Sequence, residues 1–164
     1  MIKRVVLYSL ALLLGVLLAA PLAAKVTVEF VEPDRYADTG DRRFDQDRNL
    51  ERLESFLLES AKECLDADES LTIRVLDVDL AGRWEWWHDP SGLRVMRDID
   101  WPRMKLDYVH LDAGGEVIAE EREWISDKTY LRRSTRRPTE RRPLRHEQVM
   151  IEEWVQSRFC ADRD

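Results

Sequence analysis

The amino-acid sequence predicts a small α+β domain: an antiparallel sheet of about five to six strands with two amphipathic helices packed on one face. Apolar residues recur at helical spacing in two segments, one in each half of the chain. Between these segments, apolar and polar residues alternate in several short runs that turn-forming residues separate. The resulting order, one strand, a helix, several strands and a second helix, fits two helices covering one side of a sheet.

The N-terminus has the three zones of a cleaved secretory signal peptide. Lys3 and Arg4 give a positive start, residues 5–18 form an apolar run, and small residues end the segment at Ala24. The run is shorter than the roughly 20 residues that span a bilayer. This favours cleavage after Ala24 over the alternative, a permanent membrane anchor. We therefore expect residues 1–24 to be a signal peptide, with no stable transmembrane segment left after cleavage.

The charge of the remaining chain limits its partners. Residues 25–164 number about 140, the usual size of a single domain. Without Lys3 and Arg4 the chain carries 24 basic against 33 acidic side chains, a formal charge of about −9. General nucleic-acid binding requires a net positive surface. We expect a single domain that works in the periplasm and binds no nucleic acid.

Two cysteines, Cys64 and Cys160, fall in this domain. An exported protein meets conditions in which disulfides form and persist. Each cysteine lies near the C-terminal end of a predicted helix, so a disulfide would join the first helix to the last and stabilise the fold by about 4 kcal/mol. Two separate buried thiols are the alternative. No C-x-x-C motif or histidine cluster beside them indicates metal or redox chemistry, and we expect no cofactor.

The first half of the domain predicts one strand and one helix. Residues 26–31 alternate apolar and polar side chains and form the strand. Apolar residues then recur at steps of three and four between residues 50 and 64, which predicts a helix. Asp47 or Asn49 can cap the start of this helix, and Leu65 ends it.

The centre of the chain predicts antiparallel sheet. Residues 71–80 form a strand whose alternation would place Asp77 and Asp79 on the same face as its apolar side chains. Because burying carboxylates is costly, we expect a bulge or the end of the strand near Leu76. Turns rich in glycine, aspartate and proline then separate two hairpins. Their strands are residues 83–88 with 93–99 and residues 104–111 with 116–125.

The last third predicts an arginine-rich loop and a helix. Pro138 and Pro143 interrupt the arginine-rich segment, so we interpret it as a loop. Residues 146–159 place apolar side chains at helical spacing and form the second amphipathic helix. Seven arginines gather in the segment: Arg132, Arg133, Arg136, Arg137, Arg141, Arg142 and Arg145.

Four separated motifs resemble one known family. They read LTIRVLDVDLAGR, LRVMRDIDWPRMKLDY, SDKTYL and HEQVMIEEW, in this order behind a VEFVEP opening. In order and spacing they are similar to the bacterial domain of unknown function 3016 family, over nearly the whole predicted domain. The resemblance implies a small exported proteobacterial protein and supplies no catalytic residues. The motifs occupy residues 71–83, 93–108, 126–131 and 146–154.

Two Asp-x-Asp pairs are candidate ligands for a metal ion: Asp77 with Asp79, and Asp98 with Asp100. If the two segments lie side by side, their carboxylates could converge on a hard cation or form an acid/base pair. The alternative is that each carboxylate caps a turn or pairs with one of the arginines nearby in sequence. The local sequence favours this second interpretation.

Aromatic and arginine side chains give the candidate binding residues. Trp84, Trp86 and Trp87 are the densest aromatic cluster, and exposed tryptophans stack on sugar rings or anchor partners. Alternation puts Trp87 on the opposite face from the other two, so at least one side of the segment packs in the core. The arginine segment suits phosphate and carboxylate groups, or else it is solvated or folds onto the domain's own acids. Its candidate binding residues are Arg132, Arg133, Arg136, Arg137, Arg141 and Arg142.

The sequence contains none of the common catalytic signatures, such as G-x-S-x-G, S-x-x-K or H-E-x-x-H. We therefore expect a non-enzymatic binding or accessory protein of the cell envelope, whose partner is an envelope polyanion or another envelope protein. The alternative is a metal-dependent or acid/base hydrolase that uses the clustered aspartates. A purely structural role in a larger envelope complex is a third hypothesis.

Overall fold

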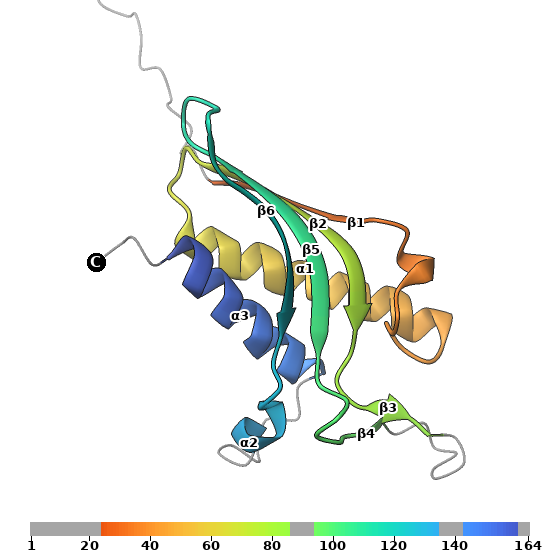
Figure 1. Cartoon of the computed structure of the whole chain (residues 1–164). Coiled ribbons are helices and arrows are strands. Elements are labelled where there is room, and N and C mark those ends of the chain that lie inside the picture. The colour runs from red at the N-terminus through yellow and green to blue at the C-terminus, as the bar shows by residue number, and fades with distance from the viewer. Residues whose placement is uncertain (1–23, 86–93, 135–142, 161–164) are drawn as a thin grey trace, which may run out of the picture.

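The computed structural model describes residues 24–85, 94–134 and 143–160 (Figure 1). The predicted signal peptide lies outside these residues, apart from Ala24, and stays a prediction. No helix in the described part of the chain has the length and apolar character needed to cross a membrane. The elements are β1 Lys25–Phe30, η1 Pro33–Arg35, α1 Arg43–Cys64, β2 Ser70–Asp79, β3 Arg83–Trp84, β4 Arg94–Val95, β5 Arg103–Leu111, β6 Val117–Ser126, α2 Tyr130–Ser134 and α3 Arg145–Phe159.

The main sheet has four strands in the order β1-β2-β5-β6, and it is mixed. The prediction of an α+β fold is confirmed, but the prediction of one antiparallel sheet of five to six strands is wrong. β1 runs parallel to β2, because α1 carries the chain back before β2 begins. β2, β5 and β6 are antiparallel to one another. β3 and β4 pair antiparallel in a separate two-stranded sheet, as the first predicted hairpin requires, and residues 86–93 of that hairpin lie outside the described residues.

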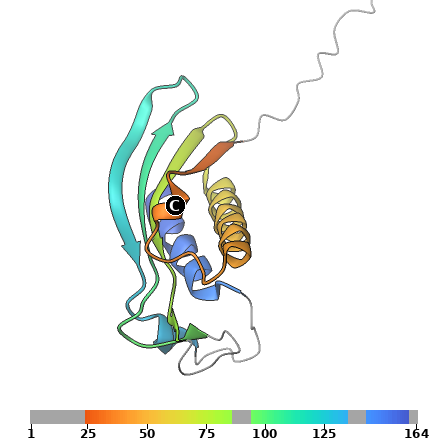
Figure 2. The same cartoon turned by 90° about the vertical axis from the view of Figure 1, so that its right-hand side faces the viewer.

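Both long helices lie on the same side of the main sheet, as Figure 2 shows. α3 keeps its predicted bounds within one residue, but α1 begins at Arg43 rather than at Asp47 or Asn49. Its extra first turn is held by ion pairs of Asp45 with Arg42 and Arg48, at 2.8 and 2.6 Å. The carboxylate of Asp45 also interacts favourably with the positive, N-terminal end of the helix dipole. These local charges start the helix before its apolar repeat begins.

The short helix α2 corrects the prediction of a loop at the start of the arginine segment. Asp127 accepts hydrogen bonds from the backbone and hydroxyl of Thr129, which orders the entry to α2. Tyr130 is buried, and its hydroxyl donates to the Arg97 carbonyl at 2.6 Å. Arg132 and the backbone of Arg133 therefore lie in a helix that a tertiary contact holds in place.

The bulge or strand end predicted near Leu76, in the strand of residues 71–80, is confirmed as a bulge. The register between β2 and β5 shifts between Val75 and Asp77, around Leu76. Val75 and Val78 are fully buried on the helix side, whereas Asp77 is only partly buried. The bulge lets the strand stay apolar on its covered face while Asp77 leaves that face.

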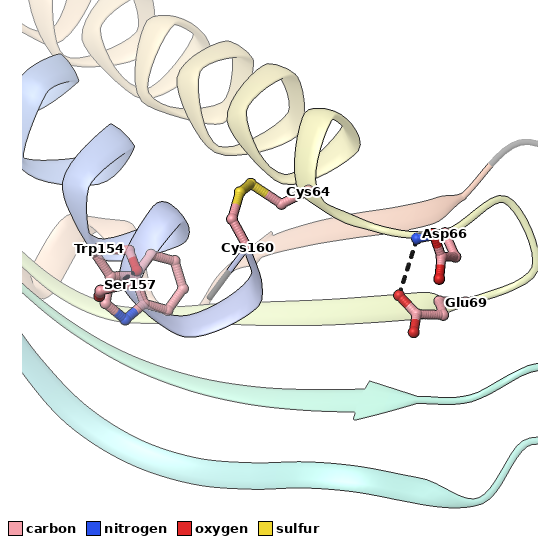
Figure 3. Close-up of a disulfide and its surroundings, with 6 residues drawn as sticks. All are labelled: Cys64, Asp66, Glu69, Trp154, Ser157 and Cys160. Atoms are coloured by element: carbon pink, nitrogen blue, oxygen red, sulfur yellow. Dashed lines mark hydrogen bonds between the residues drawn. A yellow bond between two sulfur atoms is a disulfide. The ribbon is translucent and has the colours of Figure 1, made fainter. Parts of the chain in front are cut away.

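A disulfide joins Cys64 at the end of α1 to Cys160 just after α3, with 4.9 Å between their Cα atoms (Figure 3). It links the two helices that cover the sheet across 96 residues of chain. Beside it, α1, α3 and the sheet share one core that includes Leu57, Leu106 and Trp154. The predicted pairing of the two cysteines is present in the fold.

Candidate functional site

Asp77 and Asp98, one aspartate from each candidate pair, do not form an acidic site. Asp77 uses Oδ1 to accept hydrogen bonds from the backbone of Ala37 at 2.8 Å and of Val78 at 3.0 Å. It therefore ties the loop after η1 to the bulge in β2. Asp98, from the second pair, is exposed in the turn between β4 and β5.

The other two candidate aspartates are bonded to arginines. Asp79 accepts from Arg103 at 2.6 Å, and Asp100 accepts from Arg83 at 2.9 Å. Among the described residues, no three His, Cys, Asp or Glu side chains are gathered so that they could hold a metal ion. The ion-pair and turn-capping interpretation is the one that the geometry supports, and the acids that a hydrolase would need are not assembled in this part of the chain.

The two ion pairs border a small hollow of about 80 Å³ at one end of the main sheet. Gly82 and two apolar side chains complete its rim. Its guanidinium groups reach solvent, since the side chains of Arg83 and Arg103 are 67% and 45% exposed. The hollow is lined by Asp79, Gly82, Arg83, Ile99, Asp100, Trp101 and Arg103.

Two tryptophans with cations over their rings extend this hollow into a wider surface. Trp124 on β6 is 52% exposed, with Arg103 and Lys105 at 5.9 and 5.8 Å from its ring centre. Trp101 has Lys128 at 5.5 Å from its ring centre. Because Arg103 and Trp101 both line the hollow, these groups form one continuous patch, which we call the Trp101–Trp124 surface.

Sequence reasoning missed most of this surface, because its residues are scattered along the chain. Lys105 pairs with Trp124 across β5 and β6. A bulge shifts this register between His110 and Leu111, so a regular count outward from the turn would place Lys105 opposite Glu123 rather than Trp124. Trp101 and Lys128 meet only through tertiary structure.

The predicted tryptophan cluster is only partly described. Trp84 lies on β3 and is 39% exposed, so it is available on the surface rather than packed in the core. Trp86 and Trp87 lie outside the described residues. Gly82 and Arg83, which line the hollow, directly precede Trp84 in the chain, so Trp84 lies near the hollow.

The predicted arginine binding residues are also only partly described. Arg132 is exposed on α2, which lies at the same end of the molecule as β3 and β4 (Figure 1). The Arg133 side chain is outside the described part. So are four further candidates, Arg136, Arg137, Arg141 and Arg142. Their contribution to a site stays a prediction.

A buried polar network fixes the position of the β3–β4 hairpin behind the surface. Arg94 donates to Asp38 at 2.5 Å and to the carbonyls of Ala81 and Gly82 at 3.2 and 2.6 Å. Glu147, in the first turn of α3, accepts from the Ala81 backbone at 2.7 Å. Burial raises the pKa of Glu147 above its ordinary range. Residues from three of the motifs thus meet at one structural joint.

Gly82 is the tightest point of this joint. Its φ of +71° lies in the left-handed region, and its backbone donates to the Asp100 carbonyl at 2.8 Å. A Cβ atom here would lie 2.7 Å from the Val95 carbonyl oxygen. Glycine is therefore required at this position in the connection between β2 and β3.

Two solved structures are similar over most of their length. A PelC variant from Paraburkholderia phytofirmans, described as a dodecamer, is 13% identical, with a TM-score of 0.43; 87% of this chain and 88% of that chain are covered. A minor lipoprotein from Acinetobacter baumannii is 12% identical, with a TM-score of 0.27, covering 81% and 87%. No curated protein matches the chain.

Family membership is carried by the sequence itself. The model of the family described as "Protein of unknown function (DUF3016)" matches residues 24–157. The match covers every strand and both long helices up to the last turn of α3. It also contains all four motifs and the joint around Gly82. The chain belongs to the DUF3016 family.

Proposed function

We propose that this protein is an exported, non-enzymatic binding protein of the bacterial cell envelope, and that the Trp101–Trp124 surface binds anionic lipid headgroups. One observation carries the proposal: Trp124 is half exposed on the open side of the sheet, with two cations of β5 beside its ring. Tryptophan has an apolar ring with a polar edge, which suits a membrane interface. Cations beside it suit phosphate groups.

The charge distribution supports this proposal. The whole chain is acidic, with a formal charge of −7. Yet Lys105 and Lys128 join Arg83 and Arg103 on this one surface, against three aspartates: the two that line its hollow and Asp77, which lies opposite Lys105 across β2 and β5. A local positive patch on an acidic protein directs anions to a single face and keeps the rest away from an anionic membrane. Arg132 on α2 adds a cation at the same end of the molecule.

Binding to vesicles of defined composition tests the proposal. We expect the protein to bind vesicles that contain phosphatidylglycerol and not vesicles of phosphatidylcholine, with affinity falling as salt rises. Trp124→Ala should weaken binding about tenfold, and Lys105→Gln about fivefold. Tryptophan fluorescence and vesicle sedimentation measure both.

Lys62→Gln is the matched control, because Lys62 is exposed on the last turn of α1 in the helix layer and carries the same charge. It should leave binding unchanged. Soluble polyphosphate separates the two sources of phosphate, since a lipid-binding surface should keep most of its vesicle affinity at polyphosphate concentrations that match the lipid phosphate. Equal binding to neutral vesicles, or an equal loss with Lys62→Gln, contradicts the proposal.

A further inference from the structure

β6 is a long strand at the edge of the main sheet. It has ten residues, and in the described part of the chain it pairs with β5 alone. Val117 and Ile118 at its start are 58% and 52% exposed. An edge strand presents a row of backbone N–H and C=O groups that point away from the sheet. β6 contains no proline, so every residue of this edge keeps its backbone N–H donor.

A hollow of about 270 Å³ runs beside this edge, between the second half of β6 and α3. α3 lies next to β6, on the face of the sheet that the helices cover (Figure 1). Apolar atoms of Ile125, Met150 and Trp154 form part of its lining, and Glu123 and Glu153 form another part. The edge therefore comes with a binding space for side chains directly next to it.

This combination sets the geometry of a ligand. A strand added to β6 would lie about 4.8 Å beyond it, with side chains pointing alternately to the two faces of the sheet. Every second side chain would enter the hollow between β6 and α3. Main-chain hydrogen bonds to the edge would supply affinity, and the hollow would select the side chains.

The charges of the edge select a basic ligand. β6 holds three glutamates and one arginine, and that arginine, Arg122, is bonded to Asp107 on β5. Glu120 and Glu121 of β6 are exposed, and the carboxylates of Glu123, Asp127 and Glu153 line the hollow with Arg158, which donates to Glu123 at 2.8 Å. Two copies paired through β6 would bring acids close together, which opposes self-association. A partner with lysine or arginine at alternate positions has no such conflict.

We propose that β6 and the hollow beside α3 bind an extended segment of a partner protein that carries basic side chains at alternate positions. The segment becomes a fifth strand of the main sheet. The hollow lies on the helix side of β6, whereas the ring of Trp124 lies beside Lys105 on the open side. This site is therefore separate from the Trp101–Trp124 surface and independent of the function proposed for it.

A short acetylated peptide of alternating lysine and valine, long enough to span β6, is the probe. We expect it to bind and to slow hydrogen exchange of the β6 amides that face away from β5. Glu153→Lys should weaken binding on the order of fivefold or more, and Glu153→Gln by less. A peptide of alternating lysine and proline has the same charge but cannot add as a strand, and it should not bind.

Glu120→Lys is the matched control variant, because Glu120 is exposed on the same strand but does not line the hollow. It should change affinity less than half as much as Glu153→Lys on a logarithmic scale. Binding without protection of the β6 amides, equal binding of the proline peptide, equal loss with Glu120→Lys, or no binding of the lysine–valine peptide would overturn the proposal. So would a dimer formed through β6 in the absence of peptide. Phosphatidylglycerol binding by Glu153→Lys should be retained, which separates the two sites.

Discussion

The two faces of the main sheet carry different kinds of side chain: one face is apolar and buried, and the other is charged and open to solvent. On the face covered by α1 and α3, Met104, Leu106 and Tyr108 of β5 are at most 3% exposed. Tyr108 and Trp154 meet edge to face at 5.9 Å within this layer. On the open face, by contrast, one row of charged side chains crosses all four strands in register: Glu29, Arg74, Asp107 and Arg122.

The open row is held by graded ion pairs. Arg74 lies 3.4 Å from Glu29 and 3.8 Å from Asp107, and Arg122 donates to Asp107 at 2.7 Å. Exposed ion pairs contribute about 0–1 kcal/mol each, whereas a buried leucine contributes several times more. Stability therefore resides mainly on the covered face. The open face is left free to carry a binding surface such as that around Trp124.

Carboxylates in the two regions are also perturbed in opposite directions. Burial raises the pKa of Glu147 behind the β3–β4 hairpin. On the open face, the hydrogen bond and charge of Arg122 lower the pKa of Asp107. The folded protein therefore favours the neutral form of one carboxyl group and the charged form of the other.

The largest expected effect comes from truncating a side chain on each face of β5. Leu106→Ala leaves a cavity under the helices and should lower the free energy of unfolding by about 3 kcal/mol. Val109→Ala, on the open face of the same strand, should lower it by less than about 1 kcal/mol, because Val109 is only partly buried. Urea denaturation of both variants measures the difference. Equal losses would show that the open face is covered in solution.

The contrast between the buried and the open face also explains which parts of the fold the sequence predicts. Alternation and helical spacing report burial, so they located the strands and the two long helices. They carry no information on strand direction, and the parallel pairing of β1 with β2 was missed. α2 was missed because its position depends on the tertiary contact between Tyr130 and the Arg97 carbonyl rather than on a local repeat.

The candidate site was predictable only in part. Sequence reasoning favoured arginine pairing for the aspartates, and the pairs of Asp79 with Arg103 and Asp100 with Arg83 bear this out. It did not find Trp124, because a single tryptophan in a strand gives no motif. The surface exists because folding brings cations from β5 to that ring, and such contacts have no signature within a short window of sequence.

Substitutions of Glu147 should have an intermediate effect on the free energy of unfolding. Two variants separate its role as a hydrogen-bond acceptor from the effect of its charge. Glu147→Ala leaves the buried Ala81 N–H without an acceptor and should cost about 2 kcal/mol. Glu147→Gln keeps an acceptor oxygen and should cost less at low pH. Because the folded pKa of Glu147 is raised, its stabilising effect is complete below the unfolded pKa of about 4.3 and is lost as pH rises through the folded pKa.

Thermal denaturation across pH therefore has a defined outcome for this pair of variants. The stability of Glu147→Gln relative to the unaltered protein should improve as pH rises from about 4 towards neutrality. Glu147→Ala should be the least stable of the three proteins at acidic pH. If the relative stability of Glu147→Gln instead fell with rising pH, Glu147 would be stabilised as a carboxylate, through Arg94.

The smallest effect is expected at Asp107 on the open face. Asp107→Asn removes the charge between Arg74 and Arg122 and should lower the free energy of unfolding by less than about 1 kcal/mol. The folded pKa of Asp107 is lowered, so its contribution is present above the unfolded pKa of about 3.9 and is lost as pH falls through the folded value.

The effect at Asp107 should also shrink as salt rises, because the pair lies at the surface. Asp68→Asn removes the same charge from the turn between α1 and β2, where Asp68 is exposed, and it serves as the control. A loss at Asp107 as large as that from Leu106→Ala would mean that the charged row is a structural core of its own. The contrast between the two faces would then fail, and the open face could no longer be regarded as free for binding.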